Sequence, residues 1–212
     1  YVDVSPWITS YSASLKGGNW WNSVSKDEWN FAIDQYNQIT GGAVLTNQTD
    51  QILTETFAIL TVSDENNRVC YASNAYYDVL WPKETAFYSV APARLPESCQ
   101  GKTVDLVVVP GEFGQFPVDF NPLLASQAAF VDESSVLVSV VNNLNASISH
   151  ARVYVILRDS TDRIVGGGFG TSELIRSGSS IGVTVPVAYL GNQEELSITA
   201  FATLPADAEF GK

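Results

Sequence analysis

The side chains able to perform acid–base or nucleophilic chemistry are few and scattered along the chain. The only histidine is His150, which precedes an apolar run and belongs to no recognisable motif, so a Ser–His–acid or Cys–His site has no second candidate base. Adjacent acidic pairs occur, but 23 Asp and Glu residues produce such pairs by chance, and no calcium-loop spacing is present. The sequence therefore predicts a protein that is not an enzyme and that uses no metal or cofactor.

A glycine-rich segment, Gly166–Gly170, superficially resembles a phosphate-binding loop. It lacks the Lys-Ser/Thr pair of a P-loop and opens no βαβ unit. We expect a glycine-rich strand end or bulge instead.

Charge and composition exclude several partners. The chain carries 11 Lys and Arg against 23 Asp and Glu, a net charge of −12, which argues against nucleic acid or an anionic membrane. No apolar run approaches the ~20 residues that span a bilayer. Methionine is absent even at position 1, and the simplest account is an exported protein whose leader has been removed. We therefore expect an extracellular or cell-surface location.

The two cysteines, Cys70 and Cys99, fit export. In an oxidising compartment they would close a loop of about 30 residues and stabilise the fold by roughly 3.5 kcal/mol in the chain-entropy model. The alternative is a pair of unrelated buried thiols. We expect the disulfide.

Two sequons mark candidate glycosylation sites. Asn47 belongs to Asn-Gln-Thr and Asn145 to Asn-Ala-Ser. Both lie where loops or strand ends are expected, as an accessible acceptor requires.

The chain contains an internal repeat at an offset of 95 residues. The polar turn Ser63–Val69 corresponds to Arg158–Ile164, with Asp first and Arg four residues later in both. Strand-like patterns and turn positions keep this register through the rest of the two copies, which indicates a tandem duplication.

Each copy is predicted to be all-β. Short runs rich in Val, Ile, Thr and aromatics are separated by turn residues, the spacing typical of a β-sandwich. In one strand of each copy every second residue is aliphatic, which predicts one apolar face that points inward. Those inward residues are Ala58, Leu60 and Val62 in the first copy and Val153, Val155 and Leu157 in the second.

The first forty residues differ in kind. The run Trp7–Leu15 alternates strictly, and one face carries Trp7, Thr9, Tyr11, Ala13 and Leu15. No adjacent segment could form its hairpin partner, so we expect an extended arm with one face to bury. A capping box at Ser25–Glu28, followed by Trp29, Ile33 and Tyr36 at helical spacing, predicts a helix near Lys26–Asn37.

The repeat resembles the FxLYD-type immunoglobulin-like domains of exported prokaryotic proteins. The positions of the name motif are Leu60, Val62, Ser63 and Asp64 in the first copy and Val155, Leu157, Arg158 and Asp159 in the second. The Asp and the aliphatic positions match the family, whereas its Phe and Tyr are absent. The resemblance implies an extracytoplasmic sandwich and supplies no catalytic residues.

Together these patterns predict two tandem immunoglobulin-like β-sandwiches with an N-terminal arm and one short helix. The arm and helix are expected over 1–40, the first module over 41–112, a Phe-rich linker over 113–126 and the second module over 127–212. The favoured function is a self-assembling structural subunit of a fibre or filament, whose arm binds a neighbouring copy head-to-tail, as in strand-complemented fibres.

The alternative function is adhesion or carbohydrate binding through tryptophan side chains. Four of the five tryptophans, Trp7, Trp20, Trp21 and Trp29, lie in the N-terminal segment, and the fifth is Trp81. Aromatic faces stack on sugars, but they also bury an arm against a sandwich. The sequence leaves open whether the arm pairs within its own chain or in another.

Overall fold

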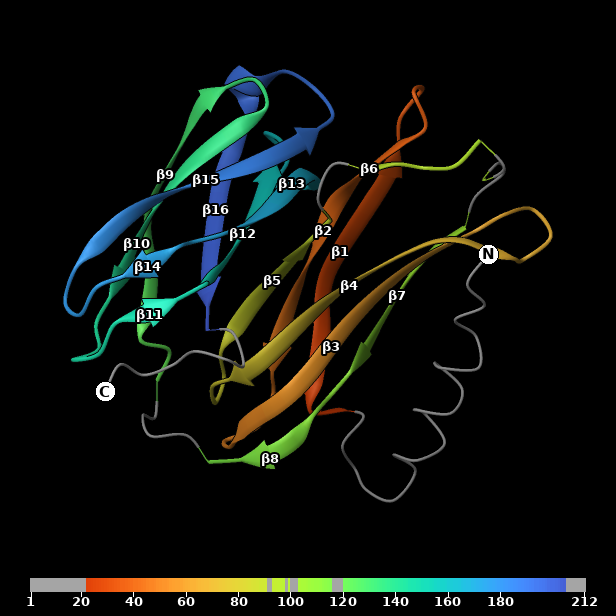
Figure 1. The fold of residues 1–212 in the computed structure, drawn as a ribbon. Coiled ribbons are helices and arrows are strands. Elements are labelled where there is room, and N and C mark those ends of the chain that lie inside the picture. The colour runs from red at the N-terminus through yellow and green to blue at the C-terminus, as the bar shows by residue number, and fades with distance from the viewer. Residues whose placement is uncertain (1–21, 91–92, 98, 100–102, 116–119, 205–212) are drawn as a thin grey trace.

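A computed structural model describes residues 22–90, 93–97, 99, 103–115 and 120–204 of the chain. The expected arm, Trp7–Leu15, lies outside the described residues. Within them the protein is all-β, as predicted, and every paired strand is antiparallel (Figure 1). Helical structure in this part of the chain is limited to short turns such as the 3₁₀ helix η2 (Gln193–Glu195).

The N-terminal half contains eight strands in two sheets. They are β1 (Val24–Ile33), β2 (Gln38–Asn47), β3 (Ile52–Ser63), β4 (Val69–Leu80), β5 (Thr85–Ser89), β6 (Ala93–Arg94), β7 (Thr103–Val109) and β8 (Glu112–Gly114). One sheet has the order β1-β2-β5, with β6 on β2, and the other has the order β4-β3-β7, with β8 on β3.

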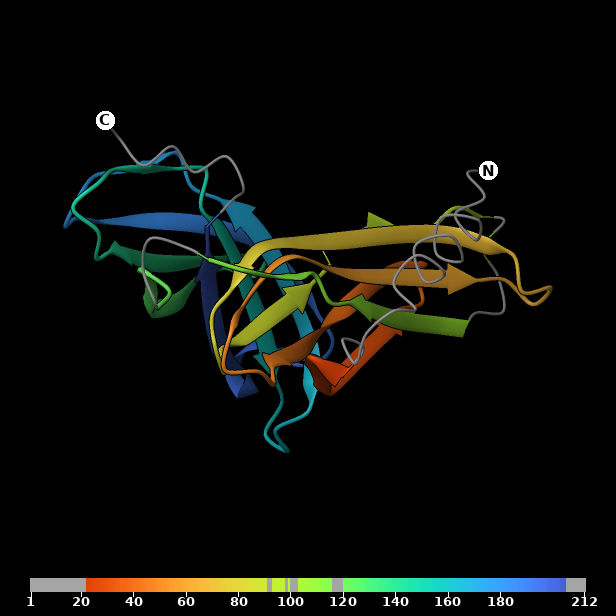
Figure 2. The same cartoon turned by 90° about the horizontal axis from the view of Figure 1, so that it is seen from below.

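The C-terminal half contains the remaining strands. They are β9 (Leu123–Asp132), β10 (Ser135–Asn142), β11 (Ile148–Ser149), β12 (Arg152–Arg158), β13 (Ile164–Thr171), β14 (Leu174–Ile175), β15 (Ser180–Tyr189) and β16 (Ser197–Thr203). Six of them form one sheet in the order β16-β12-β13-β15-β10-β9, and β11 pairs with β14. Figure 2 shows the two halves side by side along the long axis of the molecule.

Strand pairing in the two halves recurs at the offset that the sequence predicts. Leu45 of β2 pairs with Ala86 of β5, and Val140 of β10, 95 residues later, pairs with Ile181 of β15. The β3–β4 and β12–β13 ladders likewise match at 95, including the bulge where each turn begins. The first strand of each half, β1 or β9, corresponds to the other at an offset of 99 residues and carries the same bulge. The offset differs from 95 because the β1–β2 connection is four residues longer than the β9–β10 connection.

Two buried asparagines secure the same turn in each half. Asn47 is 0% exposed, and its Nδ2 donates hydrogen bonds to three backbone carbonyls, those of Gln51, Leu80 and Trp81, at 2.9–3.1 Å. Asn142, also 0% exposed, donates to the carbonyls 95 residues later, those of Ala146, Ile175 and Arg176. One side chain in each half thereby satisfies backbone groups of two separate loops.

Residues in the left-handed backbone region recur in the same register. The pairs with φ of 57–64° are Asn67 and Asp162, Glu55 and His150, and Lys83 and Gly178. Before Asn67 and Asp162, the carboxylates of Asp64 and Asp159 accept backbone N–H bonds inside the turn, an arrangement for which Asp is favoured in tight turns.

The prediction of a helix near Lys26–Asn37 is wrong. Val24–Ile33 is strand β1, paired along its length with β2. The segment also has period-two order, since Trp29, Phe31 and Ile33 alternate, and cross-strand pairing outweighs the local capping signal. The expected capping box is replaced by a bulge between Lys26 and Glu28.

Two apolar cores lie between the sheets. The first gathers residues of β2, β3, β4, β5 and β7, and the second gathers residues of β10, β12, β15 and β16. All six inward residues expected from alternation are fully buried, at 0% exposure. The first core also includes Tyr154 from β12, so the two halves share part of one core.

Asn47→Ala is expected to lower the free energy of unfolding by about 2–3 kcal/mol, because it removes the donor for carbonyls that are largely buried. Asn142→Ala should have a similar effect. The exposed neighbour Asn143→Ala is the control and should change stability by less than about 0.5 kcal/mol. Urea unfolding of the three variants measures this. Equal stability of Asn47→Ala and Asn143→Ala would contradict the assigned role.

Candidate functional site

The expected disulfide is confirmed. Cys70 of β4 is bonded to Cys99, with Cα atoms 5.4 Å apart and a sequence separation of 29. Cys99 is fully buried against the first core. The bond therefore ties the segment between β6 and β7 to the edge strand β4.

Replacing both cysteines by alanine is expected to lower the free energy of unfolding by about 3.5 kcal/mol, because the denatured chain regains the freedom of a 29-residue loop. Reduction of the wild type should give the same loss. Denaturant unfolding with and without reductant measures it, and reductant should leave the double alanine variant unchanged. A wild type whose midpoint does not move on reduction would contradict the prediction.

The two candidate glycosylation sites lie in different environments. Asn47 has no exposed surface, and its amide nitrogen already makes three hydrogen bonds, so the folded protein has no room for a glycan there. The expectation of an accessible acceptor is therefore corrected for Asn47. Asn145 is exposed, between β10 and β11, and remains a geometrically available acceptor.

The tryptophans that the structure describes do not form a row. Trp81 is 2% exposed within the second core, whereas Trp29 is 40% exposed on β1, with the Lys26 ammonium 5.5 Å from its ring centroid. The other three lie outside the described residues. A sugar-stacking platform on the described surface would therefore have Trp29 as its only tryptophan.

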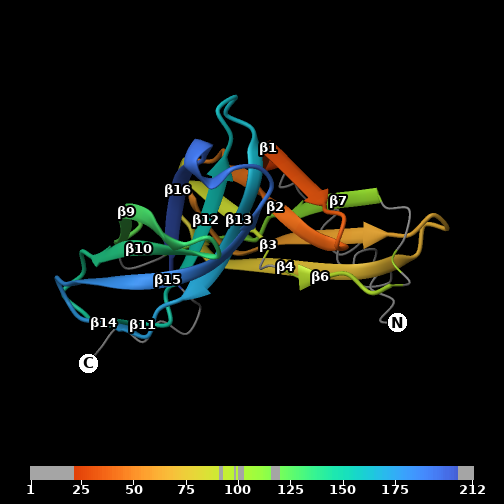
Figure 3. The ribbon, with the colours of Figure 1, turned by 90° about the horizontal axis from the view of Figure 1, so that it is seen from above.

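The most extensive feature that sequence reasoning missed is a face-to-face contact between the two halves. The outer face of the β1-β2-β5 sheet lies against the outer face of β12 and β13 (Figure 3). Val153, Val155 and Leu157 point into the second core, so the residues between them, Tyr154 and Ile156, point out into this contact and are buried by it.

Glycines allow the two faces to approach closely. A Cβ atom on Gly42 of β2 would lie 3.3 Å from the side chain of Ile156, and one on Gly167 of β13 would lie 3.1 Å from the Cβ of Ser89. The glycine-rich segment Gly166–Gly170 is thus part of strand β13 in an interface. The expected strand location is right. A Cβ atom on Gly167 would meet Ser89 of the other half, whereas Cβ atoms on Gly166, Gly168 and Gly170 would meet β15 of the same sheet.

Polar groups cross the contact at its margins. Arg158 Nη1 donates to both carboxylate oxygens of Glu28, at 2.9 and 2.7 Å. Thr40 Oγ1 donates to the carbonyl of Ala188 at 2.6 Å, and Asn30 Nδ2 donates to the carbonyl of Ile164 at 2.5 Å. These bonds fix the relative position of two faces whose centre is apolar.

An opening in the first half receives an aromatic residue of the second. In the C-terminal half, β13 and β15 are hydrogen-bonded through Gly166–Gly168, whereas the corresponding strands β4 and β5 do not pair. Tyr154 lies at this opening, with its ring centroid 5.9 Å from that of Tyr77 and 5.6 Å from that of Phe169.

A hollow of about 300 Å³ remains beside Tyr154. Arg152 is the one charged residue that lines it, and its guanidinium donates to the carbonyl of Tyr76 and lies 5.9 Å from that ring. Burial raises the pKa of Tyr154 to about 12, and burial likewise raises the pKa of the Tyr71 phenol. These phenols are neutral at physiological pH, so the hollow offers no general base.

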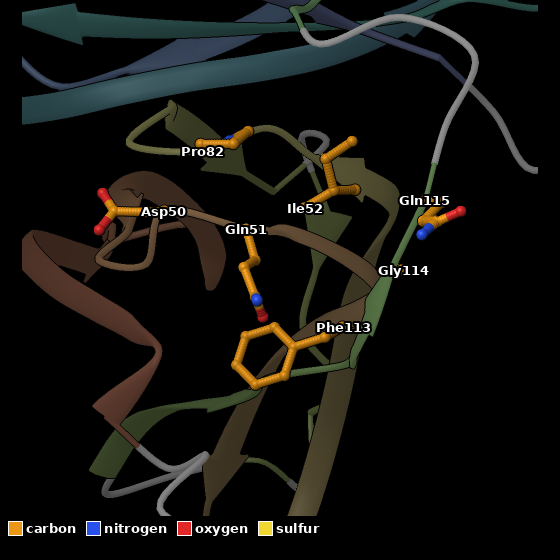
Figure 4. Close-up of a pocket in the computed structure, with 7 residues that line it drawn as sticks. All are labelled: Asp50, Gln51, Ile52, Pro82, Phe113, Gly114 and Gln115. Atoms are coloured by element: carbon orange, nitrogen blue, oxygen red, sulfur yellow. The ribbon is translucent and has the colours of Figure 1, made fainter.

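A second, wider hollow of about 790 Å³ lies between β8 and the start of β3 (Figure 4). Its lining residues are Asp50, Gln51, Ile52, Pro82, Phe113, Gly114 and Gln115. Asp50, the only ionisable residue among them, is 3.2 Å from the ammonium of Lys83. Neither hollow gathers the acid, base and nucleophile that an active site requires.

His150, the only histidine of the chain, lies between β11 and β12. His150 is exposed, and its backbone N–H donates to the carbonyl of Glu173. Within the described residues, no three His, Cys, Asp or Glu side chains gather as a metal site would require. No described helix is long and apolar enough to cross a membrane.

The half-buried carboxyl of Glu84 links the end of the first half to the start of the second. Glu84 Oε2 accepts from the backbone N–H of Trp81 at 3.0 Å, and Oε1 accepts from Nδ2 of Asn121 at 2.7 Å. Asn121 also donates to the carbonyl of Ala202. Burial outweighs these bonds and raises the pKa of Glu84 to about 7.

Glu84 is expected to make stability fall with rising pH. The folded form binds the proton more tightly than the unfolded form, whose pKa is 4.5. Its contribution is complete below about pH 4.5 and is lost as the pH rises through about 7, a change of about 3 kcal/mol. Glu84→Ser introduces serine, which the second half has at the corresponding position 179, and removes the pH-dependent contribution of the Glu84 carboxyl. The stability difference between wild type and variant should therefore drift by about 3 kcal/mol between pH 4.5 and 8, and a constant difference would contradict the prediction.

The outer edge of β7 is the other feature with interaction potential. β7 pairs with β3, and no other described strand pairs with it. Its inward residues Val104, Leu106 and Val108 pack against the first core. Lys26 Nζ donates to the carbonyl of Leu106 at 2.6 Å. An edge strand with free backbone groups is a template for a further strand, and a lysine beside it is a common form of protection.

Comparison with known proteins gives no family. No protein-family model and no curated protein matches the chain. Among solved structures, a 7S globulin from Momordica charantia is 6% identical, with 84% of this chain and 86% of the globulin covered and a TM-score of 0.13. A TM-score this low carries no argument about fold or function.

Proposed function

We propose that the protein is a non-enzymatic, extracellular structural subunit that assembles with copies of itself, using its N-terminal arm as a strand added to a neighbour. The observation that carries the proposal is the edge of β7, with which no described strand other than β3 pairs. The arm Trp7–Leu15 alternates over nine residues and is long enough to pair along the seven residues of β7.

The proposed subunit consists of two tandem immunoglobulin-like sandwiches, Val24–Gly114 and Leu123–Thr203. The strand registers that recur at 95 residues support a duplication, and the sheet orders β1-β2-β5 and β4-β3-β7 resemble a sandwich of this class with its last strand missing. The first unit then begins ahead of the expected boundary at residue 41, because β1 pairs along the whole of β2.

An extracellular location is supported by the chemistry of the chain. A disulfide between Cys70 and Cys99 persists in oxidising compartments and is rare in reducing ones. The net charge of −12 and the low share of charged residues, 16%, fit a protein that binds neither nucleic acid nor an anionic membrane.

Deletion of residues 1–15 is expected to abolish self-assembly and to leave the cooperative unfolding transition in place, because the described strands that enclose the two cores begin at Val24. Sedimentation velocity of the full chain and the truncated chain measures assembly. If the truncated chain formed the same assembly, the strand-donor proposal would be contradicted.

A matched pair of arm variants separates the two faces of the arm. Trp7→Ser, Tyr11→Ser and Leu15→Ser together should prevent assembly, because they remove the side chains that a neighbour would bury. Ile8→Ser, Ser10→Ala and Ser12→Ala together change the opposite face and should assemble as the wild type does. Equal behaviour of the two triple variants would contradict one-sided burial of the arm.

A further inference from the structure

The outer face of the β9-β10-β15 sheet is a surface without charge. Its outward residues alternate along each strand with those that pack in the second core. They are Leu124, Gln127, Ala129 and Val131 on β9, Ser135, Leu137, Ser139 and Val141 on β10, and Ser180, Gly182, Thr184 and Pro186 on β15. None of these twelve side chains is acidic or basic, although the chain as a whole carries a net charge of −12.

Apolar side chains lie exposed on this face. Leu124 is 54% exposed, Val131 is 61% exposed and Leu137, on the central strand β10, is 44% exposed. A Cβ atom on Gly182 would come within 2.9 Å of the Leu137 side chain, so Leu137 lies across Gly182 and keeps the centre of the face level. A level apolar patch on a sheet is typical of an interaction site.

The chemistry of the face selects its partner. Nucleic acid or an anionic membrane would need basic side chains, and a sugar would need an aromatic ring, and the twelve outward residues include neither. A second copy of the same face meets the remaining requirement, because two uncharged faces can be buried together without an unpaired charge on either side. In an acidic chain, such a face is where two copies can approach without like-charge repulsion.

We infer that the β9-β10-β15 face binds the same face of a second copy of the chain about a twofold axis. The contact is isologous, so each copy contributes the same residues and the pair closes on itself. The two sheets would stack about 10 Å apart, as the two sheets of a sandwich do. Because β10 is the middle strand, its central outward residues Leu137 and Ser139 lie closest to the axis and approach their own counterparts.

The size of the face sets the strength of the contact. Strands β9 and β15 have 10 residues each and β10 has 8. Three strands of this length cover roughly 15 by 30 Å, so two copies of the face would bury on the order of 1,000 Å². That area is at the low end for specific interfaces, so the pair should form reversibly and depend on protein concentration.

The paired contact is independent of the N-terminal arm. The β9-β10-β15 face and the edge of β7 lie toward opposite ends of the molecule (Figure 3). The head-to-tail contact proposed for the arm propagates, whereas a twofold contact joins two chains only. Where both act, the twofold contact would hold two end-to-end assemblies side by side.

A single introduced cysteine tests the contact in the full chain. Cys70 and Cys99 are bonded to each other, so Ser139→Cys supplies one reactive thiol per chain. A short bis-maleimide reagent should then convert the variant to a covalent dimer, in a yield that rises with protein concentration. The thioether bonds formed are resistant to reductant, so the dimer is read on a reducing gel.

A matched serine outside the face is the control for the crosslink. Ser197 is exposed on β16, and Ser197→Cys should remain largely monomeric under the same conditions. If Ser139→Cys gave no dimer at any concentration, the inference would be overturned. Equal dimer yields from the two variants would also overturn it, because they would reflect random collision.

A non-covalent measurement uses the full-length chain with the arm face changed by Trp7→Ser, Tyr11→Ser and Leu15→Ser. In this background, Leu137→Asp should raise the Kd of the pair about tenfold or more, because two carboxylates would be buried close together. Leu174→Asp changes another exposed leucine, on β14 outside the face, and should leave the Kd unchanged. Sedimentation equilibrium measures both, and an unchanged Kd for Leu137→Asp would overturn the inference.

The outcomes separate the inference from the proposed function. Pairing that persists in the arm variant, with larger assemblies lost, supports both contacts. Larger assemblies that persist in the arm variant would overturn the strand-donor proposal, while a Ser139 dimer would still support the pair. A wild type that assembles, with no Ser139 dimer, would overturn the pair and leave the proposed function standing.

Discussion

The close approach of two sheets between the halves is the constraint on which the rest of the architecture depends. It needs a glycine on each side, Gly42 opposite Ile156 and Gly167 opposite Ser89, because backbone and side chain meet there at contact distance. A side chain at either position would push the sheets apart, and the ion pair of Glu28 with Arg158 would lose its geometry. The two described halves therefore pack directly against each other and share the core around Tyr154.

The same unit has been adapted differently in its two positions. The second half pairs β13 with β15 and so joins its strands in one sheet of six. The first half leaves β4 and β5 apart, and there Tyr154 enters from the neighbouring half while the Cys70–Cys99 bond holds the adjacent edge. The disulfide thus stabilises the half whose sandwich is the more open. This gives a physical reason for a bond that has no counterpart in the second half.

Local sequence patterns predicted much of the fold and little of the contact between halves. Period-two alternation at Ala58, Leu60 and Val62 identified the inward face correctly, and the Asp64 and Asp159 turns marked the offset of the repeat. The capping box at Ser25–Glu28 misled, because a local helix signal carries no information about the strand that β2 offers. Gly167 was expected in a strand or bulge, but its partner Ser89 is 78 residues away, and no local pattern reveals a contact at that distance in sequence. The burial of Asn47 was missed for the same reason, although its match with Asn142 at an offset of 95 was a usable signal that the residue has a structural role.

The features of the described structure that are open to a partner are surfaces: the edge of β7 and the outer face of β9-β10-β15. A chain with these features is suited to binding another chain of its own kind. Electron microscopy of the purified full-length protein over a range of concentrations tests that account most directly. The account predicts unbranched filaments whose repeating unit is one elongated molecule, with neighbours joined end to end. Single particles of the size of one chain at every concentration would contradict it.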